Sequence, residues 1–65
     1  MYFVFYRTTD VFAAEEALQA QGIGTEIVPT PVQDKAYCGV CVQINDSNAE
    51  NSKKCLAEMN YVVLP

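Results

Sequence analysis

The sequence predicts an α+β domain in which one antiparallel sheet of four strands carries two helices on a single face. Two stretches have apolar residues at helical spacing, and four short stretches are rich in aromatic and β-branched residues. Their order is βαββαβ, and short connections join all of them. With 65 residues, the chain has room for one domain, so we expect a single domain over residues 1–65 with a thin hydrophobic core.

Each element follows from its own residue pattern. The strands are short runs of Tyr, Phe, Val and Ile, and the helices repeat apolar residues three and four positions apart. Pro29 and Pro31 are expected to end one strand, because proline has no N–H to donate to a ladder, and a loop over 29–37 follows. The predicted elements are strands over residues 2–7, 23–28, 38–44 and 61–65 and helices over residues 8–22 and 45–60.

The ends of both helices carry capping signals. Thr8 or Thr9 is the expected N-cap of the first helix, and Gly22 is a natural left-handed stop after it. In the second helix, Ser47 and Glu50 have the spacing of a capping box.

The βαββαβ order with such short connections is that of a ferredoxin-like domain, which places the first and third strands in the centre of the sheet. Strand alternation then divides the sheet residues between two faces. The face that meets the helices is expected to carry Phe3, Phe5, Val40, Val42 and Ile44. The uncovered face is expected to carry Tyr2, Val4, Tyr6 and Cys41. An uncovered apolar face on a small acidic protein predicts a homodimer or a partner protein there.

Composition excludes several classes of function. The net charge is −4, and the four basic residues form no stripe, so neither a nucleic acid nor an anionic membrane surface is an expected partner. No apolar run has the length of a membrane span, and the N-terminal MYFVFYR lacks the features of a signal peptide. Three cysteines is an odd count, which favours reduced thiols and a cytoplasmic protein. The absence of His removes the usual general base.

The segment VPTPVQDKAYCGVCV, residues 28–42, contains the main candidate chemistry. Cys38 and Cys41 have C-x-x-C spacing, but strand periodicity follows Cys38, and residues three apart in a strand point to opposite faces. Their Cα atoms would then lie about 10 Å apart, beyond the roughly 7 Å that a disulfide tolerates. A bridge requires a later strand start or a sharp bend at Gly39. Structural zinc needs four ligands, and three cysteines without His do not supply them, so no metal or cofactor is expected.

A single working thiol, Cys38, is the remaining chemical interpretation. It follows nine irregular residues, and Gly39 leaves room for the close approach of another backbone. Lys35 is three residues upstream, where it can favour the thiolate. Alternatively, Cys38 opens a buried strand and has no chemical role. Cys55 lies on the inner stripe of the second helix and is expected to be a core residue.

The whole chain resembles the selenium/sulfur carrier-like family of small bacterial proteins. The resemblance is carried by YFVFYRTTD at the start, by GIGTEIVPTP at the end of the first helix, and by Cys38-Gly39, which six residues separate from Pro-Thr-Pro (Pro29, Thr30 and Pro31 here). The sequence departs from the family pattern after Pro-Thr-Pro, where a basic residue is usual, and before the cysteine, where small or hydroxyl-bearing residues are common. The departing residues are Val32, Lys35, Ala36 and Tyr37.

The resemblance implies a carrier, rather than a turnover enzyme, that holds sulfur or selenium on Cys38. A thiolate can hold such an atom as a persulfide or selenopersulfide, and donor and acceptor proteins are then the expected partners. Cys41, if reachable, would be the resolving thiol that releases the cargo. Two other functions stay open: a non-catalytic dimerisation or partner-binding module, and a thiol-disulfide regulator that uses Cys38 and Cys41.

Overall fold

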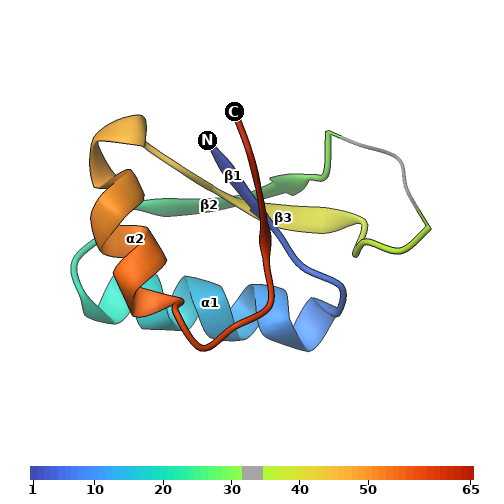
Figure 1. Cartoon of the computed structure of the whole chain (residues 1–65), viewed down its shortest axis with the longest axis horizontal. Coiled ribbons are helices and arrows are strands. Elements are labelled where there is room, and N and C mark those ends of the chain that lie inside the picture. The colour runs from blue at the N-terminus through green and yellow to red at the C-terminus, as the bar shows by residue number, and fades with distance from the viewer. Residues whose placement is uncertain (32–34) are drawn as a thin grey trace.

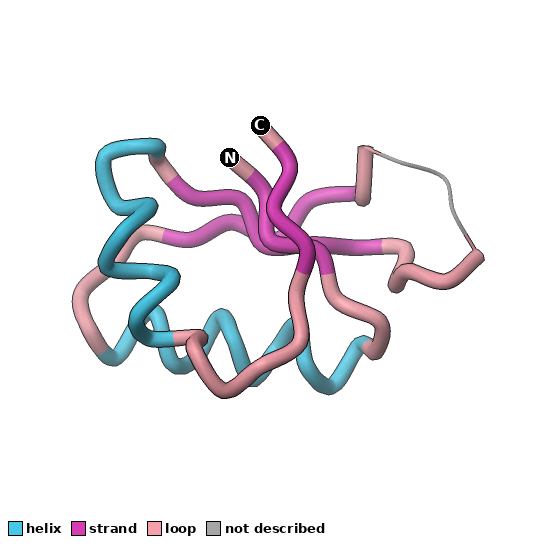
Figure 2. Tube along the Cα trace, viewed as in Figure 1, coloured by secondary structure: helices cyan, strands magenta, loops and turns pink. Residues whose placement is uncertain are grey.

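A computed structural model describes residues 1–31 and 35–65 of the chain. The described residues form a four-stranded antiparallel sheet in the order β2-β3-β1-β4, and both helices lie on one side of it (Figure 1). The elements are β1 (Tyr2–Val4), α1 (Thr8–Ala20), β2 (Thr25–Pro29), β3 (Val40–Ile44), the 3₁₀ turn η1 (Asp46–Asn48), α2 (Ala49–Cys55) and β4 (Val62–Leu64). This is the predicted α+β, ferredoxin-like arrangement, with β1 and β3 in the centre. The two ends of the chain lie side by side because β1 pairs with β4 (Figure 2).

The hydrophobic core lies between the sheet and the helices, as the strand alternation predicts. It combines buried side chains from the sheet with the inner stripe of α1, and Tyr61 meets the Phe3 ring edge-on at 5.0 Å between centroids. All five sheet residues predicted to meet the helices belong to this core or pack against it. The buried core residues are Phe3, Phe5, Val11, Ala14, Leu18, Ile23, Val42, Ile44 and Leu56.

The end of α1 confirms the predicted glycine stop. Gly22 has a φ of +75°, and its N–H donates to the Gln19 carbonyl oxygen at 2.9 Å. The Ile23 N–H donates to the Leu18 carbonyl oxygen at 3.0 Å, and the Ile23 side chain is buried against the core. This pair of bonds is the Schellman arrangement, which satisfies the last carbonyl groups of the helix.

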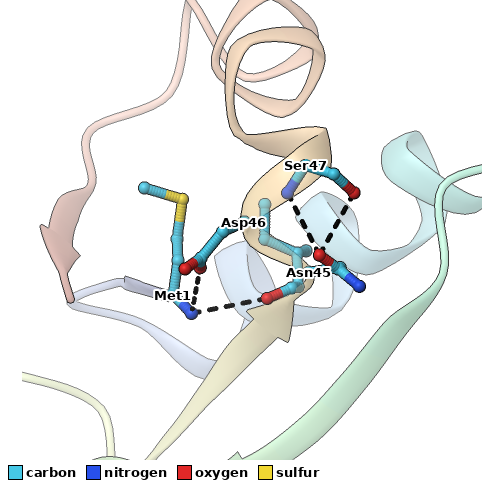
Figure 3. Close-up of polar contacts among 5 residues, drawn as sticks. Met1, Asn45, Asp46 and Ser47 are labelled. Carbon is cyan, nitrogen blue, oxygen red and sulfur yellow. Dashed lines mark hydrogen bonds and ion pairs between the residues drawn. The ribbon is translucent and has the colours of Figure 1, made fainter.

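The predicted caps at both helix starts are wrong. Arg7 occupies the N-cap position of α1 without a capping side chain, and Thr8 is the first helical residue. Before α2, Asn45 rather than Ser47 acts as the cap: its Oδ1 accepts hydrogen bonds from the Ser47 N–H and hydroxyl, both at 3.1 Å (Figure 3). These bonds begin a 3₁₀ turn, so α2 starts later than predicted.

The amino group of Met1 lies beside the same turn. It donates to Asp46 Oδ1 at 3.1 Å and to the Ile44 carbonyl oxygen at 3.4 Å (Figure 3). The Asp46 side chain is 86% exposed, so this ion pair contributes little to stability.

The edge strand β2 ends at Pro29, one residue later than the predicted strand over residues 23–28. Pro29 is the last residue of β2 and pairs with Val40, because an edge strand tolerates a residue that has no N–H. The third strand begins at Val40, so Cys38 and Gly39 precede it. The predicted loop over 29–37 is therefore shorter at its start, and its residues 32–34, including Val32, lie outside the described part of the chain.

The face of the sheet opposite the helices differs from the prediction. Val4 and Cys41 do not belong to the helix-side core, yet both are fully buried. They lie on the two central strands, beside Val62 and Val28 respectively, so neighbouring side chains rather than helices shield them. Tyr2 is half-buried, and Tyr6 is 49% exposed beyond the end of β1. Two of the four residues predicted to line an open interface are thus inaccessible.

None of the helices in the described ranges has the length and apolarity needed to cross a membrane.

Candidate functional site

Cys38 lies where three elements meet: the end of β1, the end of β2 and the start of α1. Its backbone N–H donates to the Phe5 carbonyl oxygen at 2.8 Å, just after β1. Its carbonyl oxygen accepts a hydrogen bond from the Thr30 hydroxyl at 2.8 Å, just after β2. In Figure 1, the chain that enters β3 passes close to the turn between β1 and α1. Cys38 therefore continues the line of β3 between its two neighbouring strands.

The thiol of Cys38 faces the start of α1. Its Sγ lies 3.2 Å from the hydroxyl oxygen of Thr8, the first residue of that helix. The side chain is half-buried and packs against the helix-side core, which places it on the same face of the sheet as Val40 and Val42. The start of an α-helix carries unpaired N–H groups and the positive end of the helix dipole. This environment favours an anion on the sulfur.

The local hydrogen bonds lower the pKa of Cys38. The hydroxyl of Thr8 makes the largest contribution, and the backbone N–H groups of Val40 and Gly39 add to it, while partial burial opposes them. Hydrogen bonds lower a thiol pKa when they stabilise the charged form. Cys38 is therefore a thiol with enhanced thiolate character at an accessible position.

The predicted role of Lys35 stays a prediction. Lys35 is exposed and is not among the groups that lower the Cys38 pKa. Ala36 is exposed as well, and Tyr37 is half-buried next to the cysteine.

The space beside Gly39 is open. A side chain added at Gly39 would meet nothing within 4 Å, so no other part of the described chain uses the room that Gly39 leaves. Of the two prolines around Thr30, Pro29 pairs in β2 and Pro31 is exposed.

Cys41 has the opposite environment. It is fully buried, it does not join the helix-side core, and its Sγ lies 3.9 Å from the Pro29 carbonyl oxygen. Burial raises its pKa, and the nearby charge of Cys38 acts in the same direction, while the side chain of Thr30 acts against them. Cys38 and Cys41 are both free thiols on opposite faces of the sheet.

Cys55 packs against the helix-side core as predicted and is half-buried. It lines a hollow of about 360 Å³ between the end of α1 and α2. Within the described residues, no group of three or more His, Cys, Asp or Glu side chains is placed to hold a metal ion.

Two site residues escaped the sequence analysis. Thr8 was expected to cap a helix, but its hydroxyl contacts the thiol instead. Tyr6 was assigned to the sheet face, but its ring stacks on Tyr37 at 5.4 Å between centroids, beside the cysteine. The contacts join residues about thirty positions apart, so no local spacing signals them. The TTD segment at the start of the first helix was the available signal for Thr8.

The family described as "Putative Se/S carrier protein-like" matches residues 1–64, which is nearly the whole chain. No curated protein and no solved structure matches the chain. The match covers the start of α1, the Pro-Thr-Pro segment and Cys38-Gly39 together. The chain belongs to the Se/S carrier protein-like family.

Proposed function

We propose that this protein carries sulfur or selenium on Cys38, as a persulfide or a selenopersulfide. The observation that carries the proposal is the half-buried Cys38 thiol held 3.2 Å from the Thr8 hydroxyl at the start of α1. The family match gives independent support for a sulfur or selenium cargo.

The loading step needs only a thiolate and a donor persulfide. The Cys38 thiolate attacks the terminal sulfur of the donor, a new S–S bond forms, and the donor leaves as a thiolate after its own S–S bond breaks. No net oxidation takes place, because one S–S bond replaces another. The selenium reaction starts from a donor selenopersulfide: the Cys38 thiolate attacks its terminal selenium, a new S–Se bond forms, and the donor leaves as a thiolate after its own S–Se bond breaks.

The start of α1 suits the loaded form as well as the free thiol. The carried atom is bonded about 2 Å beyond Sγ, a distance typical of an S–S bond. It stays close to the Thr8 hydroxyl, and its negative charge is favoured by the N-terminal end of the helix dipole. Unloading reverses the reaction, with an acceptor thiolate attacking the carried atom. The protein acts as a cytoplasmic carrier between a donor and an acceptor protein and needs no cofactor in this scheme.

Mass spectrometry tests this proposal directly. The purified chain is incubated with a cysteine desulfurase and cysteine, and we expect an added mass of about 32 Da on Cys38. With a selenium donor the addition is roughly 80 Da. The Cys38→Ser variant should gain neither mass, whereas the matched control Cys55→Ser should load as the parent chain does. Loading that survives in Cys38→Ser, or no loading in the parent chain, contradicts the proposal.

A second candidate function is a dimerisation or partner-binding module. The exposed Tyr6 ring and its stacking on Tyr37 favour a surface at the thiol end, in place of the wide sheet face that was predicted. Because Val4 and Cys41 are buried, a homodimer through that face would depend on Tyr2 and Tyr6. Sedimentation of the parent chain and of Tyr6→Ser tests the homodimer: a dimer that Tyr6→Ser dissociates supports dimerisation through this surface, and a monomeric parent chain contradicts it.

A further inference from the structure

Thr30, the central residue of the Pro-Thr-Pro segment, holds the backbone on both sides of the peptide bond between Cys38 and Gly39. Its hydroxyl donates to the Cys38 carbonyl oxygen at 2.8 Å. Its own N–H donates to the Gly39 carbonyl oxygen at 3.0 Å. Thr30 follows the last residue of β2, so its N–H bond continues the pairing of β2 with β3 by one residue pair, and its hydroxyl adds a second bond. The two bonds reach the carbonyl groups of two successive peptide units, Cys38–Gly39 and Gly39–Val40, and so fix the orientation of both.

The other side of Cys38 is fixed from β1. The Cys38 N–H donates to the Phe5 carbonyl oxygen at 2.8 Å, so the donor and the acceptor of this residue are both occupied. With the backbone held from two strands, the side chain is directed to the helix side of the sheet, where Sγ meets the Thr8 hydroxyl. The geometry of a reacting group matters at this scale, since a displacement of about 1 Å can slow a reaction by roughly a hundredfold.

The Thr30 hydroxyl has one proton to donate, and the charge state of Cys41 affects which group receives it. That hydroxyl donates to the Cys38 carbonyl oxygen, and the Thr30 side chain also interacts with the Cys41 thiol. The neutral Cys41 thiol donates its S–H to the Pro29 carbonyl oxygen at 3.9 Å, whereas a Cys41 thiolate would compete with the Cys38 carbonyl oxygen for the Thr30 proton. Cys41 is fully buried, which disfavours the thiolate and leaves that proton with the Cys38 carbonyl group.

We propose that Thr30 is a positioning residue, which holds Cys38 in the orientation needed to accept sulfur or selenium. This inference rests on the proposed function, because the cargo that the orientation serves is the one proposed there. The hydrogen bonds themselves predict a measurable effect on thiol chemistry that does not depend on the cargo.

The experiment measures the rate at which iodoacetamide alkylates Cys38 between pH 6 and 10, with the site located by fragment-ion mass spectrometry. All three chains compared carry Cys55→Ser, and the chain with no other change is the parent in this experiment. The second chain adds Thr30→Val, which keeps the shape of the side chain without the hydroxyl. The third adds Thr30→Ser, which keeps the hydroxyl. We expect Thr30→Val to move the pH profile to higher pH and to slow alkylation at pH 7 by about fivefold, the effect of one lost hydrogen bond. Thr30→Ser should stay within about twofold of the parent.

A role limited to stability would lower the urea midpoint of Thr30→Val and leave the pH profile of the folded chain unchanged. That result overturns the inference, and so does a Thr30→Ser variant that behaves like Thr30→Val. If Thr30→Val does not fold, NMR of the unmodified chain decides the matter. We then expect a Thr30 hydroxyl proton protected from exchange with water, and a freely exchanging proton overturns the inference.

Sulfur loading of the same chains separates this inference from the proposed function. If the parent loads sulfur and Thr30→Val has the pH profile of the parent, the positioning role is wrong and the carrier function stands. If the parent does not load sulfur but its pH profile shifts in Thr30→Val, the carrier function is wrong and Thr30 still orients the thiol.

Discussion

Cys38 and Cys41 are three residues apart, yet their surroundings are opposite. Cys38 is half-buried on the helix side of the sheet, next to the start of α1, and its hydrogen bonds lower its pKa. Cys41 is fully buried on the other side, and burial raises its pKa. Strand alternation produces this difference, because an odd separation along an extended chain exchanges the two faces. C-x-x-C spacing therefore places one half-buried thiol with a lowered pKa and one buried thiol with a raised pKa three residues apart.

Alkylation of the folded chain should show the largest difference between the two thiols. Cys41 can react only when the sheet opens locally, so we expect it to react at least about a hundredfold more slowly than Cys38 at pH 8. In urea the two rates should become equal. Iodoacetamide labelling followed by fragment-ion mass spectrometry measures both rates in one sample. Comparable rates in the folded chain would remove the contrast between the two sites.

Serine substitution should affect stability at one cysteine far more than at the other. Cys41→Ser places a more polar group in a buried position, and we expect it to lower the free energy of unfolding by about 1 to 3 kcal/mol. Cys38→Ser changes a half-buried side chain, and the expected loss is about 0.5 kcal/mol or less. Urea unfolding monitored by circular dichroism checks both values. An equal loss in the two variants would show that burial does not separate the sites.

The contact between Thr8 and the Cys38 thiol can be tested without changing a cysteine. Thr8→Val removes the hydroxyl that makes the largest contribution to the lowered pKa of Cys38, so that pKa should rise. The loss of one hydrogen bond of about 1 kcal/mol should slow Cys38 alkylation at pH 7 by about fivefold. The pH dependence of Cys38 alkylation measures the shift.

Thr9→Val is the matched control for this experiment. Thr9 lies in the same turn of α1 and is also exposed, but the thiol contact belongs to Thr8. We expect Thr9→Val to leave the pH profile unchanged. A similar shift in both variants would assign the effect to the helix start as a whole rather than to the Thr8 hydroxyl.

The smallest predicted effect is a difference in how the two thiols link stability to pH. Because the folded-state pKa of Cys38 is lowered, its contribution to stability is present above the unfolded-state pKa of about 8.5 and is lost as pH falls through the folded-state value. Because the folded-state pKa of Cys41 is raised, its contribution is present below about 8.5 and is lost as pH rises through the folded-state value. Urea midpoints between pH 7 and 10 should show these opposite trends when the parent is compared with Cys38→Ser and with Cys41→Ser. Parallel trends in the two comparisons would contradict the assigned directions.

Regular patterns in the sequence predicted the architecture well. Strand alternation gave the helix-side core, and a glycine at the end of an apolar periodic stretch gave the end of α1. The helix starts could not be predicted in the same way, because several side chains of similar capping ability compete. Asn45 took the place expected for Ser47, and Thr8 became the first residue of its helix.

The candidate site was predicted only in part. Cys38 and the Pro-Thr-Pro segment stood out along the chain, but the contacts of Thr8 and Thr30 with Cys38 depend on tertiary pairing. Val4 and Cys41 were predicted to be exposed, but both are buried. Strand alternation assigns a residue to one face of the sheet and does not show how tightly neighbouring side chains cover that face.

Pro29 at the end of β2 has a consequence for association. An edge strand can recruit a strand from another molecule through its unpaired N–H and carbonyl groups. Pro29 lacks that N–H, and the exposed, charged Glu26 lies on the same edge strand. Both features discourage uncontrolled stacking of copies edge to edge. The β2 edge of the sheet is therefore poorly suited to recruiting another copy, although it lies next to the half-buried Cys38 thiol.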